Sequence, residues 1–164
     1  MPTATWIALA NYTVSGSTDG LVEFTNIPTT GYSDLVLVME YNPTTTESAY
    51  IQLNGDTGTN YFRTLMYGSG SGSGTVVANA SVNRMRPGTG IPNARHVLIA
   101  QFLDSNATNK HKTVLTRFDD ASNETAAGVF RWANTNAITS ITIGQDASGA
   151  FNVGSAFSLY GIAS

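Results

Sequence analysis

Five apolar residues follow one another in Leu35-Val36-Leu37-Val38-Met39, and this run is the strongest indication of the fold class. Such a run, bounded by Gly31 and by Asn42-Pro43, predicts a strand in the middle of a sheet with both faces covered. Residues 96–103, HVLIAQFL, form a second apolar run of the same kind. No segment of about a dozen residues keeps the i, i+3, i+4, i+7 apolar pattern of an amphipathic helix, so we expect no long helix.

The rest of the chain alternates short strands with turns. Turn signals such as Asn54-Gly55 and Pro87-Gly88 separate runs rich in Val, Ile, Thr, Tyr and Phe. The further strands expected are residues 5–14, 21–25, 49–53, 61–67, 75–82, 112–119, 129–133, 138–143 and 157–162. About ten strands in 164 residues predict an all-β chain. We expect residues 1–164 to form a single antiparallel β-sandwich, jelly-roll-like, with two apolar inner faces.

Two details of the last strands can also be predicted. Ile138, Ile141 and Ile143 do not share one strand parity, so a bulge or kink is expected near Thr139-Ser140. Gly161 has no side chain, so it is expected to permit the close approach of another backbone.

The composition excludes several classes of protein. Charged residues are 12% of the chain, against about 25% in an ordinary domain, and the net charge is −3. With 8 Lys+Arg against 11 Asp+Glu and no basic run, we expect no nucleic-acid partner. No apolar stretch is long enough to span a membrane, and Met1 to Trp6 lack the features of a secretory leader. The absence of cysteine excludes disulfides and thiolate chemistry.

Catalytic motifs are absent as well. The two histidines, His96 in an apolar run and His111 in a polar loop, are expected to be structural or superficial rather than part of a triad. The segment Gly68 to Gly74 never spells Gly-x-Ser-x-Gly and lacks the Lys-Ser/Thr of a phosphate loop. It reads as a flexible hairpin loop, with an adhesive loop that orders against a neighbouring subunit as the alternative.

Carboxylates and aromatic residues give no stronger site. Residues 54–58, NGDTG, resemble a calcium loop only superficially and read better as a hairpin turn, and Asp119-Asp120 offer at most two oxygens to calcium. Phe130 and Trp132 share a strand face, as do alternate residues from Tyr61 to Tyr67. These sets fit core packing better than a carbohydrate platform. We therefore predict no catalytic, cofactor-binding or metal site, and no enzyme.

Three segments carry distinctive turn-and-strand signatures. They are FTNIP at residues 24–28, LNGDTGTNY at residues 53–61, and the C-terminal pair WANTNAITSITI and FNVGSAFSLYGI at residues 132–143 and 151–162. Together they resemble small β-sandwich virion-structural proteins of tailed bacteriophages, of the capsid decoration or tail-fibre-tip type. The resemblance spans the beginning, middle and end of the chain. It implies a sandwich fold and a virion location, but it carries no catalytic residue.

The chain has no Gly-X-Y repeat and no heptads, which favours a capsid cement (decoration) protein over a fibre. Its expected partners are the major capsid protein and further copies of itself, as a trimer or dimer, on the capsid surface. The alternative is a receptor-binding or adhesin module of a tail fibre that binds host-surface carbohydrate. The low charge fraction predicts that much of the surface is covered in the working state, because fewer charges lower the desolvation cost of each contact.

Overall fold

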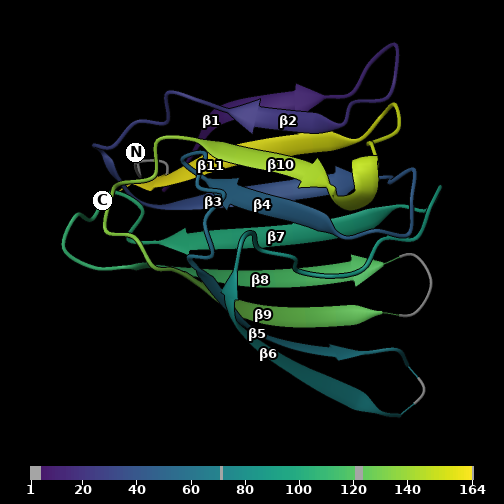
Figure 1. The fold of residues 1–164 in the computed structure, drawn as a ribbon. Coiled ribbons are helices and arrows are strands. Elements are labelled where there is room, and N and C mark those ends of the chain that lie inside the picture. Colours follow the sequence, from purple (N-terminus) through teal and green to yellow (C-terminus); the bar gives the residue numbers. More distant parts are fainter. Residues whose placement is uncertain (1–4, 71, 121–123, 164) are drawn as a thin grey trace.

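Two antiparallel sheets of unequal size pack face to face in the computed structural model, which describes residues 5–70, 72–120 and 124–163 (Figure 1). The strands are β1 (Trp6–Thr13), β2 (Leu21–Phe24), β3 (Tyr32–Tyr41), β4 (Ala49–Leu53), β5 (Tyr61–Gly68), β6 (Gly74–Val82), β7 (His96–Leu103), β8 (Lys112–Asp120), β9 (Thr125–Trp132), β10 (Ile141–Gln145) and β11 (Ala156–Ala163). The larger sheet has eight strands in the order β1-β11-β3-β7-β8-β9-β5-β6, and the smaller has the order β2-β10-β4. The predicted all-β, antiparallel sandwich is confirmed.

The eleven expected strands all exist, although several boundaries move, by up to four residues. Strand β9 begins at Thr125 instead of Val129, since Ala126, Ala127 and Gly128 have little intrinsic preference for strands and gave no signal. The only helical segment of the described residues is the three-residue 3-10 turn η1 (Asp146–Ser148), which agrees with the expectation of no long helix.

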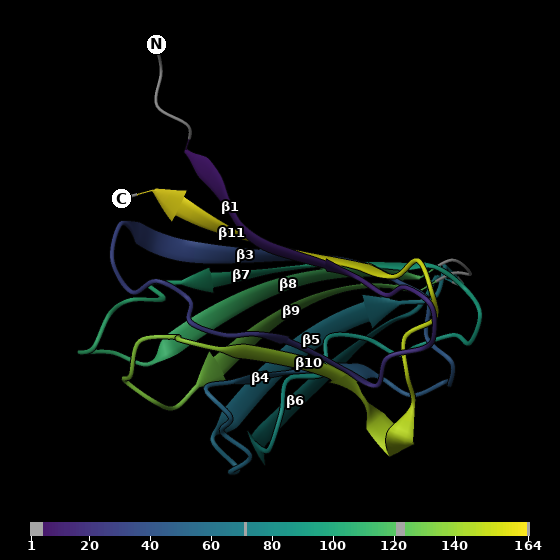
Figure 2. The ribbon, with the colours of Figure 1, turned by 90° about the horizontal axis from the view of Figure 1, so that it is seen from above.

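The core lies between the two sheets, and the larger sheet curls around it (Figure 2). Strand β3 lies between β11 and β7, as a central strand should. Leu35 and Leu37 face the core and Val36 is only 2% exposed on the opposite side, so the prediction of cover on both faces is confirmed there. For β7 the same prediction is wrong, because Val97 is 45% exposed and burial alternates along the strand.

The turn at Asn54-Gly55 joins the two sheets and is not a hairpin. Asn54 and Gly55 both have positive φ, at 52° and 66°, and Asp56 N donates to Leu53 O at 2.9 Å, so the predicted turn exists. However, β4 belongs to the smaller sheet and β5 to the larger. The Asp56 carboxylate accepts a 2.7 Å hydrogen bond from Trp132 Nε1 of β9, which ties the outgoing chain to the larger sheet.

A break in the chain precedes β10, close to where the isoleucine parities predict one. Thr139 N and Ser140 N both donate to Asn54 Oδ1, at 2.8 and 3.1 Å, instead of joining a ladder. Strand β10 therefore begins at Ile141, while Ile138 is buried from the preceding irregular segment. The expected kink is confirmed, and the expected start of the strand at Ile138 is wrong.

Two glycine predictions have different outcomes. A Cβ at Gly161 would collide with the ring of Tyr32, so this glycine accommodates an aromatic side chain and not another backbone. The run from Gly68 to Gly74 joins the paired strands β5 and β6, as a hairpin loop should, although Ser71 lies outside the described residues.

Candidate interaction surface

The face of the larger sheet that points away from the smaller sheet, here called the outer face, is unusually apolar. Side chains alternate strictly between core and outer face along β8 and β9. The outward positions nevertheless include Met66, Val97, Leu115 and Val129, which are 57%, 45%, 41% and 48% exposed. Scattered exposed apolar residues are ordinary, whereas a contiguous set on one face marks an interaction surface.

The strand register places Met66, Leu115 and Val129 in two rows that cross the sheet, whereas Val97 lies outside them, between Glu40 and Asp119. The first row contains Val38, Ile99, Arg117, Ala127, Met66 and Val76, each opposite the next. The second contains Tyr160, Val36, Gln101, Leu115, Val129, Thr64 and Ala78. Arg117 is the one charged residue in the two rows. Both rows end on β6, at the margin of the sheet.

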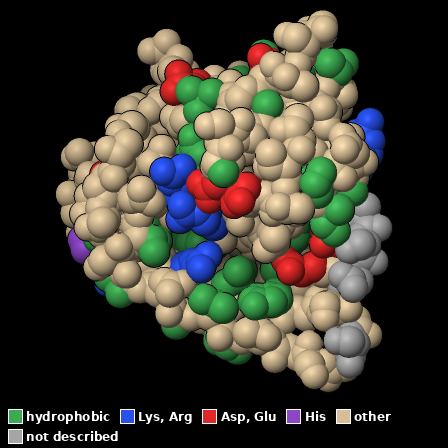
Figure 3. All heavy atoms as spheres, turned by 45° about the vertical axis from the view of Figure 1, so that its right-hand side comes forward, with side chains coloured by type: hydrophobic (Ala, Val, Ile, Leu, Met, Phe, Trp, Pro, Cys, Tyr) green, Lys and Arg blue, Asp and Glu red, His purple; other side chains and the backbone are tan. Residues whose placement is uncertain are grey.

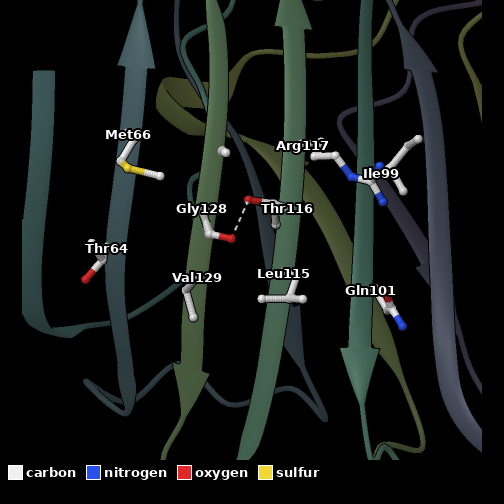
Figure 4. A pocket seen from close by; sticks show the side chains of 10 residues that line it. Thr64, Met66, Ile99, Gln101, Leu115, Thr116, Arg117, Gly128 and Val129 are labelled. Atoms are coloured by element: carbon white, nitrogen blue, oxygen red, sulfur yellow. Dashed lines mark hydrogen bonds between the residues drawn. The ribbon is translucent and has the colours of Figure 1, made fainter. Parts of the chain in front are cut away.

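A hollow of about 380 Å³ lies between the rows on strands β5 and β7 to β9 (Figure 4). Leu115, Val129 and Met66 line it, and Thr116 Oγ1 lies 3.5 Å from Gly128 O at its base. Ala127 and Gly128 leave room there because neither has a long side chain. The hollow is an open, mostly apolar depression, so it suits a protruding apolar side chain of a partner better than a polar substrate.

The sequence of β7 carries a signal for this surface. In β7 both strand parities are apolar, with Leu98 and Ala100 on one side and Val97 and Ile99 on the other. Such a strand was expected to be covered on both faces within the fold. The structure covers only one of them within the described residues, and on the other side Val97 is 45% exposed.

The two histidines lie in different surroundings. His96 is buried between the rings of Tyr41 and Phe118, whose centroids lie 5.2 and 5.6 Å away, and its Nε2 lies within 3.1 Å of the Ile91 backbone. His111 lies exposed in the loop before β8. The structural and superficial roles predicted for them agree with these positions.

The carboxylates are used locally. Asp119 and Asp120 point to opposite faces of β8, which does not suit a shared calcium ion. Asp56 is held by Gly58 N, Asn60 Nδ2 and the indole of Trp132. Its burial raises the pKa of the carboxyl, but these hydrogen bonds outweigh that effect and leave the pKa below its ordinary value. Within residues 5–70, 72–120 and 124–163, no three His, Asp or Glu side chains form a group that could hold a metal.

The predicted aromatic core is confirmed. Trp132, Phe130 and Tyr61 are completely buried, so Trp132 and Phe130 belong to the core and not to a carbohydrate platform. Trp6 is 54% exposed and lies beside the half-buried Tyr160, with ring centroids 5.9 Å apart, at the β1 and β11 end of the outer face.

The few charged side chains gather into small groups and leave most of the surface neutral, as the face in Figure 3 illustrates. One such group joins the segment after β6 to η1, because Arg84 and Arg86 both contact the Asp146 carboxylate. Lys112 is completely buried, and its Nζ donates to the carbonyls of Ala107, Lys110 and Thr135 at 2.6 to 3.2 Å. These charges form contacts within the fold.

Comparisons with known proteins add little. The sequence matches no protein-family model and no curated protein. Among solved structures, the PL-14 alginate lyase from Aplysia kurodai superposes with a TM-score of 0.30 and 8% identity, over 80% of this chain and 69% of the lyase. Likeness at this level carries no conclusion about activity. None of the helices in the described residues is long and apolar enough to cross a membrane.

Proposed function

We propose that this protein is a structural component of a tailed-phage virion, a capsid cement protein whose outer face lies against the protein shell. The observation that carries the proposal is the pair of side-chain rows on that face, which contain one charge across seven strands. A folded protein surface with apolar protrusions is the partner that such a face suits. The resemblance of the sequence to virion β-sandwich proteins supports the same assignment.

The physical mechanism is repeated association of a modest interface. Burying Met66, Leu115 and Val129 removes apolar area from water. Among the side chains of the two rows, only the charged Arg117 would lose hydrating water at a free-energy cost. Each contact is weak by itself. Many copies on one lattice hold adjoining shell subunits together, because a bound copy that touches two subunits raises the effective concentration of each for the other.

The proposal is tested on particles of the phage that encodes the chain. Quantitative mass spectrometry should find hundreds of copies per particle, whereas a few copies per particle would exclude the cement role. Particles lacking the protein should bind the purified wild type and lose binding to Leu115→Lys and Val129→Lys. The control is Val153→Lys, since Val153 is 55% exposed in the turn before β11, away from the outer face. Equal binding by all variants would contradict the assigned surface.

The second candidate, an adhesin that binds host-surface carbohydrate, is favoured by a different observation. Trp6 is 54% exposed and lies beside Tyr160, and exposed aromatic rings are the usual stacking surface for sugars. A glycan array with the wild type and Trp6→Ala separates the two functions. Specific binding that depends on Trp6 supports the adhesin, and no binding to any glycan excludes it.

A further inference from the structure

Strand β6 forms one margin of the larger sheet, and β5 is its sole partner among the described residues (Figures 1 and 2). Its residues are Gly74-Thr75-Val76-Val77-Ala78-Asn79-Ala80-Ser81-Val82, without a charge or a proline. Natural edge strands are usually protected by Lys, Pro or a bulge, since their open backbone groups pair readily with another chain. The opposite margin, β1, has such a bulge near Leu9. In β6 the register shift falls beyond Asn79 and leaves Gly74 to Asn79 regular.

The register shows which backbone groups of β6 are open. Ala133 N donates to Asn60 O at 2.8 Å, so these two opposed residues form a hydrogen-bonded pair. The backbone N–H and C=O groups of the even residues of β5 therefore point toward β9. In an antiparallel ladder such pairs alternate, so the odd residues of β5 bond to β6. Leu65 opposes Val77, which places Val77 among the bonded residues. The residues whose N–H and C=O groups aim at the open side are therefore Gly74, Val76 and Ala78.

We propose that β6 pairs antiparallel with β6 of a second copy of this chain, around a twofold axis perpendicular to the sheet beside Val76. Two residues directly opposed in such a ladder either both point their backbone N–H and C=O groups at the partner strand or both point them away. A residue of β6 with unpaired backbone groups must therefore oppose another such residue. With Val76 opposite Val76 and Gly74 opposite Ala78, the three N–H and three C=O groups of each copy are all used. A register centred on Ala78 would instead bring the irregular end of the strand into the ladder.

The side chains fit this self-pairing. On the outer face, Val76 meets Val76, and Gly74 meets Ala78; on the other face, Thr75 meets Val77. These are small and uncharged, so no like charges oppose one another, and β-branched pairs are favourable across antiparallel strands. A second copy is the occupant because its edge has the same three open residues at the same spacing. The contact does not depend on the virion assignment.

The symmetry also decides where the outer faces go. A twofold axis perpendicular to the sheet leaves both outer faces on the same side of a continuous sheet. The row that ends at Val76 then meets the same row of the partner, and the apolar surface doubles in length. Of the two oligomers expected from the sequence, this geometry selects the dimer.

A single cysteine tests the register. The chain contains no cysteine, so Val76→Cys introduces the only thiol. Opposed hydrogen-bonded residues have Cα atoms about 5.5 Å apart, which lies in the range of a disulfide. Under mild oxidation Val76→Cys should give a covalent dimer at micromolar protein. Ala78→Cys and Val97→Cys, on the same face, should stay uncrosslinked. Crosslinking by all three variants equally, or by none, would overturn the proposed register.

Sedimentation equilibrium tests the interface itself. The wild type should form dimers, and Val76→Lys should raise the dimer dissociation constant at least about tenfold, because it opposes two ammonium groups across the axis. Val76 is 66% exposed, so its replacement should leave the fold intact, which circular dichroism and the melting temperature will check. Val97→Lys, on the same face but away from the edge, should leave the dimer unchanged. A wild type that stays monomeric up to millimolar concentration, or forms trimers, would refute the proposal.

Discussion

Replacing Asp56 by alanine should be the most informative single test of how the two sheets are joined. The Asp56 carboxylate accepts hydrogen bonds from Trp132 Nε1 at 2.7 Å, from Gly58 N at 2.9 Å and from Asn60 Nδ2 at 2.9 Å. Trp132 is completely buried, so Asp56→Ala leaves its indole N–H without an acceptor. Hydrogen bonds to charged groups contribute about 1.5–3 kcal/mol each, and an orphaned buried donor costs about 1–3 kcal/mol. We expect a total loss of about 3 kcal/mol.

The assay is urea unfolding monitored by the fluorescence of Trp132, in a Trp6→Phe background so that one indole reports. Glu40→Ala is the matched control, since Glu40 is paired with Arg95 at 2.6 Å but is 55% exposed. An exposed pair of this kind contributes at most about 1 kcal/mol. If Asp56→Ala lowers the free energy of unfolding by less than about 0.5 kcal/mol, or by no more than the control does, the hydrogen bonds of Asp56 do not stabilise the fold as argued.

The pH dependence gives an independent check. Burial raises the pKa of Asp56, but its hydrogen bonds outweigh burial, so the folded pKa lies below the ordinary value of 3.8. The stability that this carboxylate contributes is fully present above the unfolded pKa and is lost as the pH falls through the lower folded pKa. The difference between wild type and Asp56→Ala should therefore be constant near neutral pH and shrink in acid. A difference that grows in acid would contradict the assignment.

Four further substitutions, all at buried positions, can be measured by the same unfolding assay. Tyr61→Phe should lower the free energy of unfolding by about 1 kcal/mol, because the Tyr61 hydroxyl bonds two backbone groups at 3.0 Å. Tyr41→Phe should leave the free energy of unfolding unchanged, because the buried Tyr41 hydroxyl has no hydrogen-bond partner in the described chain. Lys112→Met should cost at least about 2 kcal/mol by leaving three carbonyls without their ammonium donor. Gly88→Ala should cost about 1–3 kcal/mol, because its Cβ would lie 2.6 Å from Phe118 Cγ. Equal effects of the two tyrosine variants, or neutral Lys112 and Gly88 variants, would contradict these assignments.

The local strand pattern was predictable, and the assignment of strands to sheets was not. Apolar runs such as residues 35–39 and 96–103 identify strands because their signal lies within the run. The Asn54-Gly55 turn has the positive φ values of a hairpin, yet β4 and β5 separate after it. After the turn, Asp56 bonds to Trp132, a residue far away in sequence. Local turn chemistry cannot reveal such a contact.

The outer face could not be recognised from the sequence for a related reason. An apolar residue such as Val129 has the same pattern whether its cover comes from the same chain or from a partner. The number of strands in the second sheet decides between these cases, and it depends on long-range pairing. The low fraction of charged residues was the one feature of the whole sequence that indicated such a surface. Its prediction, that much of the surface is covered in the working state, is tested by the binding experiments proposed above.

The inequality of the two sheets has a consequence for local motion. Three strands cannot cover eight, and β6 has only half-buried or exposed residues, whereas β3 and β11 are rich in buried ones. Opening free energy should therefore fall across the sheet from β3 toward β6, since exposed hydrogen bonds and few buried contacts define the regions that open first. In the monomer, below the dimer dissociation constant, backbone amides of β6 should exchange with deuterium far faster than those of β3. The hairpin formed by β5 and β6 could then change its angle to fit a neighbouring molecule while the core stays rigid.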